Sequence, residues 1–150
     1  LMSANAGEGL GRISKIASGG ELSRIMLALK KVLVGCDDVE VLVFDEVDSG
    51  VSGIAAQRVG EKLSDIAADK QVLCVTHLPQ LAAMADCQFE IKKVQKDGRT
   101  FTEVDRLDIE GRKRELARLT GGENITETTL KSAEEQLAAA KKYKERLKSR

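Results

Sequence analysis

Two adjacent carboxylates, Asp45 and Glu46, are the residues of this 150-residue sequence whose types and position most directly predict chemistry. They follow four consecutive apolar residues, 41–44, which predict a strand buried on both faces. Open parallel sheets bind ligands at the carboxyl ends of their strands. One carboxylate there could hold Mg²⁺ through water while its neighbour polarises an attacking water molecule. The pair therefore indicates phosphoryl-transfer chemistry, although a strand also ends in acidic residues wherever the chain simply turns to solvent.

Small residues at the predicted start of a helix form a second candidate site. Ser18, Gly19, Gly20 and Glu21 lead into apolar residues at helical spacing, and Gly35 is a candidate helix stop. These apolar residues are Leu22, Ile25, Met26, Leu29, Val32 and Leu33. A helix N-terminus exposes backbone N–H groups and the positive end of the helix dipole, so it can bind phosphate. The alternative for the tripeptide alone is an ordinary serine cap followed by a glycine turn.

The third candidate is His77, the one histidine of the sequence. It follows a second apolar run, 71–75, and an amphipathic helix is predicted over 54–68. A strand, a helix and a strand in this order imply a right-handed crossover and a parallel pair, so His77 is expected to converge with Asp45 and Glu46. A neutral imidazole donates from one nitrogen and accepts at the other, which suits contact with phosphate and water. A capped or surface histidine is the alternative.

Together these stretches resemble the C-terminal lobe of an ABC-type ATPase head, and more closely the SMC-like heads. The motifs are Ala-Ser-Gly-Gly-Glu-Leu-Ser-Arg (17–24), Phe-Asp-Glu-Val-Asp-Ser-Gly-Val-Ser-Gly (44–53) and Val-Thr-His-Leu-Pro-Gln-Leu-Ala (75–82). Within the SMC-like heads they look like the RecN family of DNA repair proteins, from about Ser3 to the last helix. The fold expected over 1–150 is a single α/β lobe of the P-loop NTPase type. It would have parallel strands flanked by helices, then a β-hairpin and C-terminal helices.

The resemblance implies a role for each residue at the strand ends. Asp45 would be the Mg²⁺ ligand of the Walker B segment, 41–46, and Glu46 the base-like residue that activates water. His77 would be the switch histidine, which contacts the γ-phosphate of ATP and helps to hold that water. The implied cofactors are ATP and Mg²⁺.

Two other segments are implied to act across a dimer interface. The signature, 17–24, would contact the γ-phosphate of ATP held by a second head, and the D-loop, 47–53, would run along the same interface. The implied residues are Ser18, Gly19, Gly20 and Glu21 in the signature and Asp48, Ser49 and Gly50 in the D-loop. Ser52 stands where most ABC-type heads have aspartate, so it is not expected to position water as an aspartate would.

The phosphate-cradling P-loop is missing, because the dipeptide Gly-Lys does not occur and GxxxxGK[ST] therefore cannot. The chain also begins at Leu1 without an initiator methionine. We expect half of a head that is inactive alone and that needs an N-terminal Walker A lobe and a second head in an ATP-dependent homodimer. From the resemblance, the parent protein would act on DNA in double-strand break repair. The alternatives are the head of another SMC-like chromosome or recombination protein, and a non-catalytic docking lobe.

Composition sets broader limits. Lys plus Arg and Asp plus Glu number 24 each, so the chain lacks the electrostatic footprint of an autonomous nucleic-acid binder. Aromatic residues make up 3%, which predicts an aliphatic core. Three cysteines without CxxC spacing favour reduced thiols over zinc. The sequence shows no signal peptide and no bilayer-spanning run, so a cytoplasmic, nucleoid-associated protein without a membrane partner is expected.

The rest of the chain predicts a short helix over 78–85, a β-hairpin around Asp97-Gly98, and helices over 110–119 and 126–148. For the basic side chains of the hairpin, a solvated face is favoured over a DNA-binding patch. The last helix has a basic end, 141–150. Its charges are predicted to stabilise the helix or to dock on the missing lobe, and contact with DNA is the second choice. Because half a head leaves a sheet edge and apolar surface uncovered, the isolated chain is predicted to self-associate.

Overall fold

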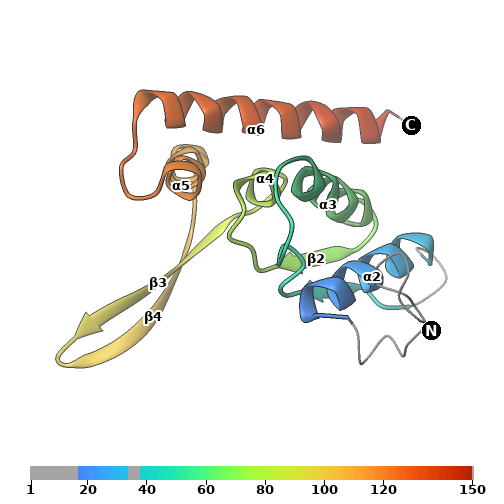
Figure 1. Cartoon of the computed structure of the whole chain (residues 1–150), viewed down its shortest axis with the longest axis horizontal. Coiled ribbons are helices and arrows are strands. Elements are labelled where there is room, and N and C mark those ends of the chain that lie inside the picture. Colours follow the sequence, from blue (N-terminus) through green and yellow to red (C-terminus); the bar gives the residue numbers. More distant parts are fainter. Residues whose placement is uncertain (1–16, 34–37, 150) are drawn as a thin grey trace, which may run out of the picture. The chain divides into compact units, whose positions relative to one another are not determined.

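The structure is a computed structural model that describes residues 17–33 and 38–149. It divides into two compact units, the first ending at His77 and the second beginning at Leu78 (Figure 1). The boundary falls directly after the predicted switch histidine. All the residues nominated above for chemistry therefore belong to the first unit.

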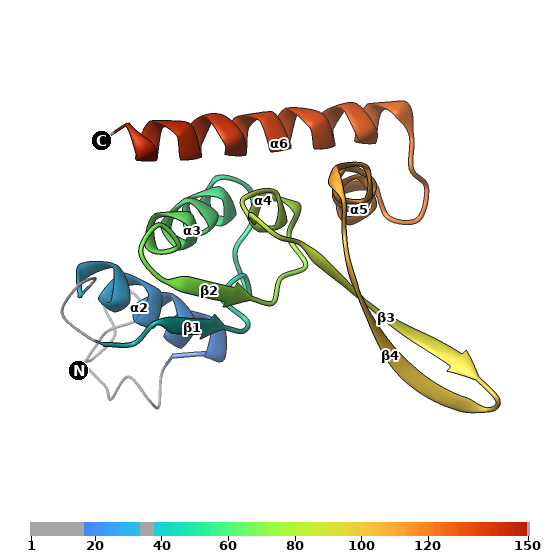
Figure 2. The ribbon, with the colours of Figure 1, turned by 180° about the vertical axis from the view of Figure 1, so that it is seen from behind.

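The described residues of the first unit form a parallel strand pair with two helices. Its elements are α2 (Gly19–Val32), β1 (Val41–Phe44), α3 (Gly53–Ile66) and β2 (Gln71–Cys74). The two strands lie side by side in parallel, with Val41 opposite Gln71 and Phe44 opposite Cys74 (Figure 2). The backbone N–H of Val75 donates to Phe44 O at 3.0 Å and continues the ladder toward His77. The predicted parallel pair is thus confirmed, and both strands end at the same edge.

The prediction that residues 41–44 are buried on both faces is wrong for this chain. Leu42 and Phe44 are buried, whereas Val41 and Val43 are 45% and 68% exposed. Successive side chains of a strand point to opposite faces. Among the described residues only one face of the β1–β2 sheet is covered, so every second side chain of the apolar run meets solvent.

Helix α2 forms where it was predicted, but its apolar stripe is also uncovered. Met26 and Leu29 are 48% and 49% exposed, while the buried positions of the helix are Gly20 and Leu27. The face that packs toward α3 is instead tied by an ion pair of 3.3 Å between Lys31 Nζ and Asp65 Oδ2. The helix ends at Val32, and the predicted stop at residue 35 lies outside the described residues.

Aliphatic side chains and one aromatic ring build the core of the first unit. Its buried apolar residues are Leu27, Leu42, Phe44, Val47, Ala56, Leu63 and Ile66. Ile66 and Val47 are completely buried. Since Val47 lies only one residue after Glu46, its burial anchors the loop that carries the predicted catalytic carboxylates.

The second unit combines a hairpin with three helices. Its elements are α4 (Pro79–Ala83), β3 (Phe89–Lys96), β4 (Arg99–Arg106), α5 (Ile109–Gly121) and α6 (Glu127–Lys148). The strands pair antiparallel, from Phe89 opposite Arg106 to Lys96 opposite Arg99. Asp97 and Gly98 both have positive φ, 51° and 71°, as a two-residue type I′ turn requires. The hairpin predicted from Asp-Gly is confirmed.

Small and aliphatic residues let the three helices of the second unit pack closely. The buried cluster contains Ala82, Ala83, Leu116, Ala117, Ala133 and Ala140. Helix α6 begins with a capping box between Thr126 and Thr129, which confirms Thr126 as its N-cap. In the part of the chain that the structure describes, no helix combines the length and the apolar character needed to cross a membrane.

Candidate functional site

The acidic pair lies in a strained turn directly after β1. Glu46 has φ of 56°, in the left-handed region that non-glycine residues seldom adopt. Its backbone N–H donates to Asp45 Oδ1 at 2.9 Å, and both side chains are exposed. Backbone strain of this kind costs about 1–3 kcal/mol and clusters at functional sites. The turn thus holds two carboxylates at the edge of the sheet, where their oxygens can accept hydrogen bonds from solvent or bind a cation.

The first turns of α2 rest directly on this loop. A Cβ placed on Gly19 would lie 2.4 Å from Glu46 Oε2, and one on Gly20 would lie 2.7 Å from Ser49 Cβ. Ser23 Oγ donates to Asp45 O at 2.8 Å, and Arg24 Nη1 donates to Ser49 O at 2.6 Å. Gly20 is therefore needed for the close approach of backbone, and the predicted signature and Walker B segments meet.

A matched pair of substitutions tests this packing. In Gly20→Ala the new methyl would meet Ser49 Cβ and the carbonyl oxygens of Glu46 and Ser49, both at 2.9 Å, so backbone must move. We expect a loss of about 1–3 kcal/mol in unfolding free energy. In Gly19→Ala the methyl meets mainly the flexible end of Glu46, so stability should change little. Urea unfolding followed by the amide signals of β1 and β2 measures both. Equal losses would contradict the packing.

Ser18 caps α2 through a reciprocal pair of bonds with Glu21. The backbone N–H of Ser18 donates to Glu21 Oε2 at 2.8 Å, and Glu21 N donates to Ser18 Oγ at 3.3 Å. The Ser18 hydroxyl in turn donates to Glu21 Oε2 at 3.0 Å. The Ser18 backbone and hydroxyl hydrogen bonds hold the pKa of Glu21 below its ordinary value. A phosphate approaching Ser18 would have to share this hydroxyl with Glu21.

Asp48 connects the loop to His77. Its carboxylate is only 3% exposed, and Oδ2 accepts from Thr76 Oγ1 at 2.6 Å and from His77 N at 3.0 Å. His77 Nδ1 lies 3.2 Å from the same oxygen. Burial alone would raise the pKa of Asp48, but the hydrogen bonds from Thr76 and His77 and the imidazole charge lower it below its ordinary value.

Cys74 is the last residue of β2, close enough to Asp45 and Asp48 to be affected by their charges. Burial raises the pKa of its thiol to about 12, with further contributions from the negative charges of Asp48 and Asp45. A thiol with this pKa stays protonated at neutral pH and is a poor nucleophile. The structure therefore agrees with the reduced state expected for Cys74, and residue 36 lies outside the described residues.

Most of the nominated residues come together. The contacts join Gly19 and Gly20 to the Glu46 turn, and Asp48 to His77. Gly50 is exposed, has φ of 71° and has open space where a Cβ would stand, so it shapes the loop without touching the other candidates. Reasoning from the sequence missed Ser23, Arg24 and Thr76 as the residues that hold the segments together. Each lies within a motif already quoted, which is the signal that could have found them.

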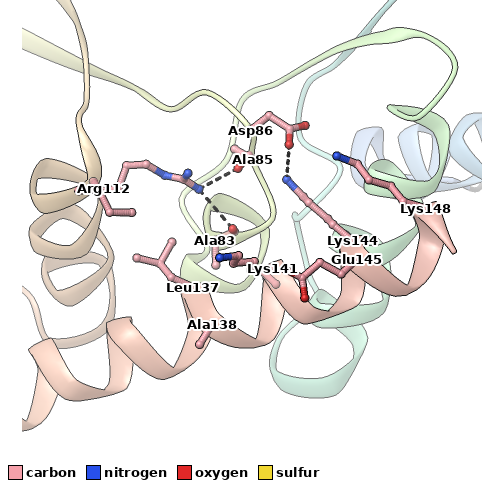
Figure 3. Close-up of a pocket in the computed structure, with 12 residues that line it drawn as sticks. Ala83, Ala85, Asp86, Arg112, Leu137, Ala138, Lys141, Lys144, Glu145 and Lys148 are labelled. Carbon is pink, nitrogen blue, oxygen red and sulfur yellow. Dashed lines mark hydrogen bonds and ion pairs between the residues drawn. The ribbon is translucent and has the colours of Figure 1, made fainter.

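A separate cavity of about 440 Å³ lies in the second unit, between α4, α5 and α6 (Figure 3). Arg112 Nη2 donates to Ala83 O and Ala85 O at 3.3 and 2.8 Å, and Lys144 Nζ contacts Asp86 Oδ1 at 2.7 Å. These bonds tie α5 and α6 to the end of α4, which is a structural task. None of the residues nominated for chemistry lines this cavity.

Comparison with known proteins adds the family. No family model matches the sequence. The chain is 48% identical over 144 residues to the DNA repair protein RecN of Bacillus subtilis. It is 49% identical over 140 residues to that of Vibrio cholerae and 51% identical over 136 residues to that of Deinococcus radiodurans. These matches cover 91–96% of this chain but only 24–25% of each relative, so the chain spans about a quarter of their length.

Among solved structures, the chain resembles one from a study of ATP-driven dimerization and DNA-stimulated activation of SMC ATPases. The TM-score is 0.52 at 23% identity, over 79% of this chain and 71% of that one. The fold is therefore the α/β fold of an SMC-type ATPase head, as expected. The matches to relatives are more specific, and they show that this chain is homologous to part of the DNA repair protein RecN.

Proposed function

We propose that this chain is the half of a RecN-type ATPase head that carries the signature, Walker B and D-loop segments and the switch histidine. One observation carries the proposal. The N-terminus of α2, the turn after β1 and the end of β2 are joined by direct contacts, from Gly19 to Glu46 and from Asp48 to His77. Three segments far apart in the sequence thus share one edge of a parallel sheet, where such sheets bind ligands.

The residues present fit a Mg²⁺ site in which the nucleotide supplies the remaining ligands. Asp45 offers an exposed carboxylate with one hydrogen bond to Oδ1, which leaves acceptor positions for a cation or its water. The described residues hold no group of three or more His, Cys, Asp or Glu side chains able to bind a metal by themselves. Mg²⁺ suits such a site, because it is usually bound by one or two carboxylates together with water and substrate phosphates. When bound, Mg²⁺ would neutralise charge on the phosphates.

Glu46 and His77 would act on the reacting end of ATP. Glu46 is proposed to orient and polarise the attacking water, since its carboxylate is exposed beside Asp45. His77, whose side chain is 72% exposed, is proposed to contact the γ-phosphate. Positioning and electrostatic stabilisation account for most phosphoryl-transfer catalysis. These two residues can therefore act only on a nucleotide that is held in a fixed position beside them.

The rest of the head would come from protein outside this chain. The P-loop lobe is proposed to cover the exposed face of the β1–β2 sheet and to hold the phosphates. The segment from Ser18 to Glu21 would contact the γ-phosphate of the ATP that a second head holds. Ser49 and Gly50 would lie along the interface between the two heads. The parent would thereby couple ATP to head dimerisation, and the names of its relatives suggest DNA repair as the process in which it acts. Without the P-loop lobe the chain is expected to be inactive.

Reconstitution tests this proposal. The 150-residue chain is mixed with the P-loop lobe of the same parent, and ATP hydrolysis and mass by light scattering are followed with and without ATP. Hydrolysis that appears only in the mixture, together with an ATP-dependent doubling of mass, is the expected result. A stable complex that hydrolyses nothing over a wide range of concentrations would instead identify a non-catalytic docking lobe.

A further inference from the structure

Asp48 is the buried carboxylate of the site, and its hydrogen bonds are unusually concentrated. Oδ2 alone faces three donors: Thr76 Oγ1 at 2.6 Å, His77 N at 3.0 Å and His77 Nδ1 at 3.2 Å. A charge that is only 3% exposed is tolerated when it is paired and hydrogen-bonded. These donors come from the end of β2, so they fix the loop after β1 to the residue proposed to contact phosphate.

The geometry also decides which ring nitrogen of His77 carries a proton. An ionised carboxylate only accepts hydrogen bonds, so a hydrogen bond across this 3.2 Å distance requires a proton on Nδ1, whether the ring is neutral or charged. The tautomer of a histidine is set by the bond that its other nitrogen makes. Nε2 is then the ring atom that remains for a ligand. Ser-His-Asp triads use a buried carboxylate on Nδ1 for the same purpose.

We propose that Asp48 is a positioning residue that acts through His77: it holds the imidazole by its Nδ1–H and so presents Nε2 to the nucleotide. This inference rests on the proposed role of His77 at the γ-phosphate. It differs from the implied D-loop role, in which Asp48 would itself line the nucleotide at a dimer interface. The simpler alternative is that Asp48 only ties the loop to β2 and that the ring orientation has no consequence.

The single histidine of the chain allows a direct spectroscopic test. Nitrogen-15 chemical shifts of the ring distinguish a protonated nitrogen from a bare one. At a pH where the ring is neutral, the isolated chain should hold His77 mainly as the Nδ1–H form. In Asp48→Ala this preference should be lost. In Asp48→Asn, which keeps a weaker oxygen acceptor in the same volume, the preference should be reduced by less.

Thr76→Val is the matched control, because it removes a donor to the same carboxylate oxygen without touching the ring. It should lower stability while leaving the Nδ1–H form dominant. A wild-type tautomer in Asp48→Ala would overturn the proposal, and so would an equal shift in Thr76→Val. If Asp48→Ala does not fold, an unchanged tautomer in Asp48→Asn would overturn it instead.

The reconstituted head separates this inference from the function on which it rests. Asp48→Ala should lower kcat about 10- to 100-fold, as loss of an orienting partner commonly does, with little change in KM for ATP. Thr76→Val should keep most of kcat. A tautomer that shifts as expected without any loss of kcat would support the positioning but remove His77 from the proposed mechanism.

Discussion

Glu46→Gln in a reconstituted head should reduce ATP hydrolysis by about 10²- to 10⁴-fold, the usual contribution of a positioned general base. The substitution keeps the side-chain shape and removes only the charge and basicity. The Glu46 side chain is exposed and accepts no hydrogen bond among the described residues, and the carbonyl oxygen that accepts from Ser49 N is unaffected by the substitution, so the fold should tolerate the amide. ATP binding should persist, because Asp45 would still hold Mg²⁺ and the P-loop lobe would still hold the phosphates. Single-turnover hydrolysis and equilibrium nucleotide binding measure the two effects separately.

Glu40→Gln is the matched control for this experiment. Glu40 directly precedes β1, at the opposite end of the strand from Glu46, and it is also exposed. The change removes one negative charge from the same strand without touching the candidate site, so hydrolysis should stay near the wild-type rate. Equal losses in both variants would point to a general charge effect. Full activity in Glu46→Gln would remove the residue from the mechanism.

The sequence predicted the local elements of this chain well, for identifiable reasons. The alternating runs around Asp97-Gly98 gave the hairpin, because two successive residues with positive φ are what a type I′ turn demands. The order of strand, helix and strand gave the parallel pair, because right-handed crossovers are nearly universal. The motif order placed Glu46 and His77 at one edge of the sheet.

What the sequence could not show was how each side chain would be used. An apolar run such as Val41–Phe44 indicates burial in the complete protein, but it does not reveal which covering layer lies outside the chain. The motif predicts Asp48 as an interface residue, but it does not reveal that the carboxylate is contacted by Thr76 and His77 within the chain. Such contacts depend on where two loops meet in space, and no periodicity records that.

The uncovered face of the β1–β2 sheet leads to the second large effect. Val43 and Leu73 are opposite each other in the register and are 68% and 50% exposed. Monomeric proteins rarely expose contiguous apolar patches larger than roughly a few hundred Å², and larger patches mark interaction sites. The isolated chain should therefore self-associate, and the same face should be the one that the P-loop lobe covers. Both associations should compete for it.

A double substitution, Val43→Lys with Leu73→Glu, tests this without adding net charge. Burying such apolar side chains contributes about 1.5–3 kcal/mol each, so replacing both should weaken association by roughly 100-fold or more. Light scattering should then show a monomer at concentrations where the wild type associates, and binding of the P-loop lobe should fall in parallel. Gln71→Lys, on the same strand face but already polar and exposed, should leave both associations nearly unchanged. If the double variant still self-associates and still binds the P-loop lobe as strongly as the wild type, the sheet face is the contact surface for neither.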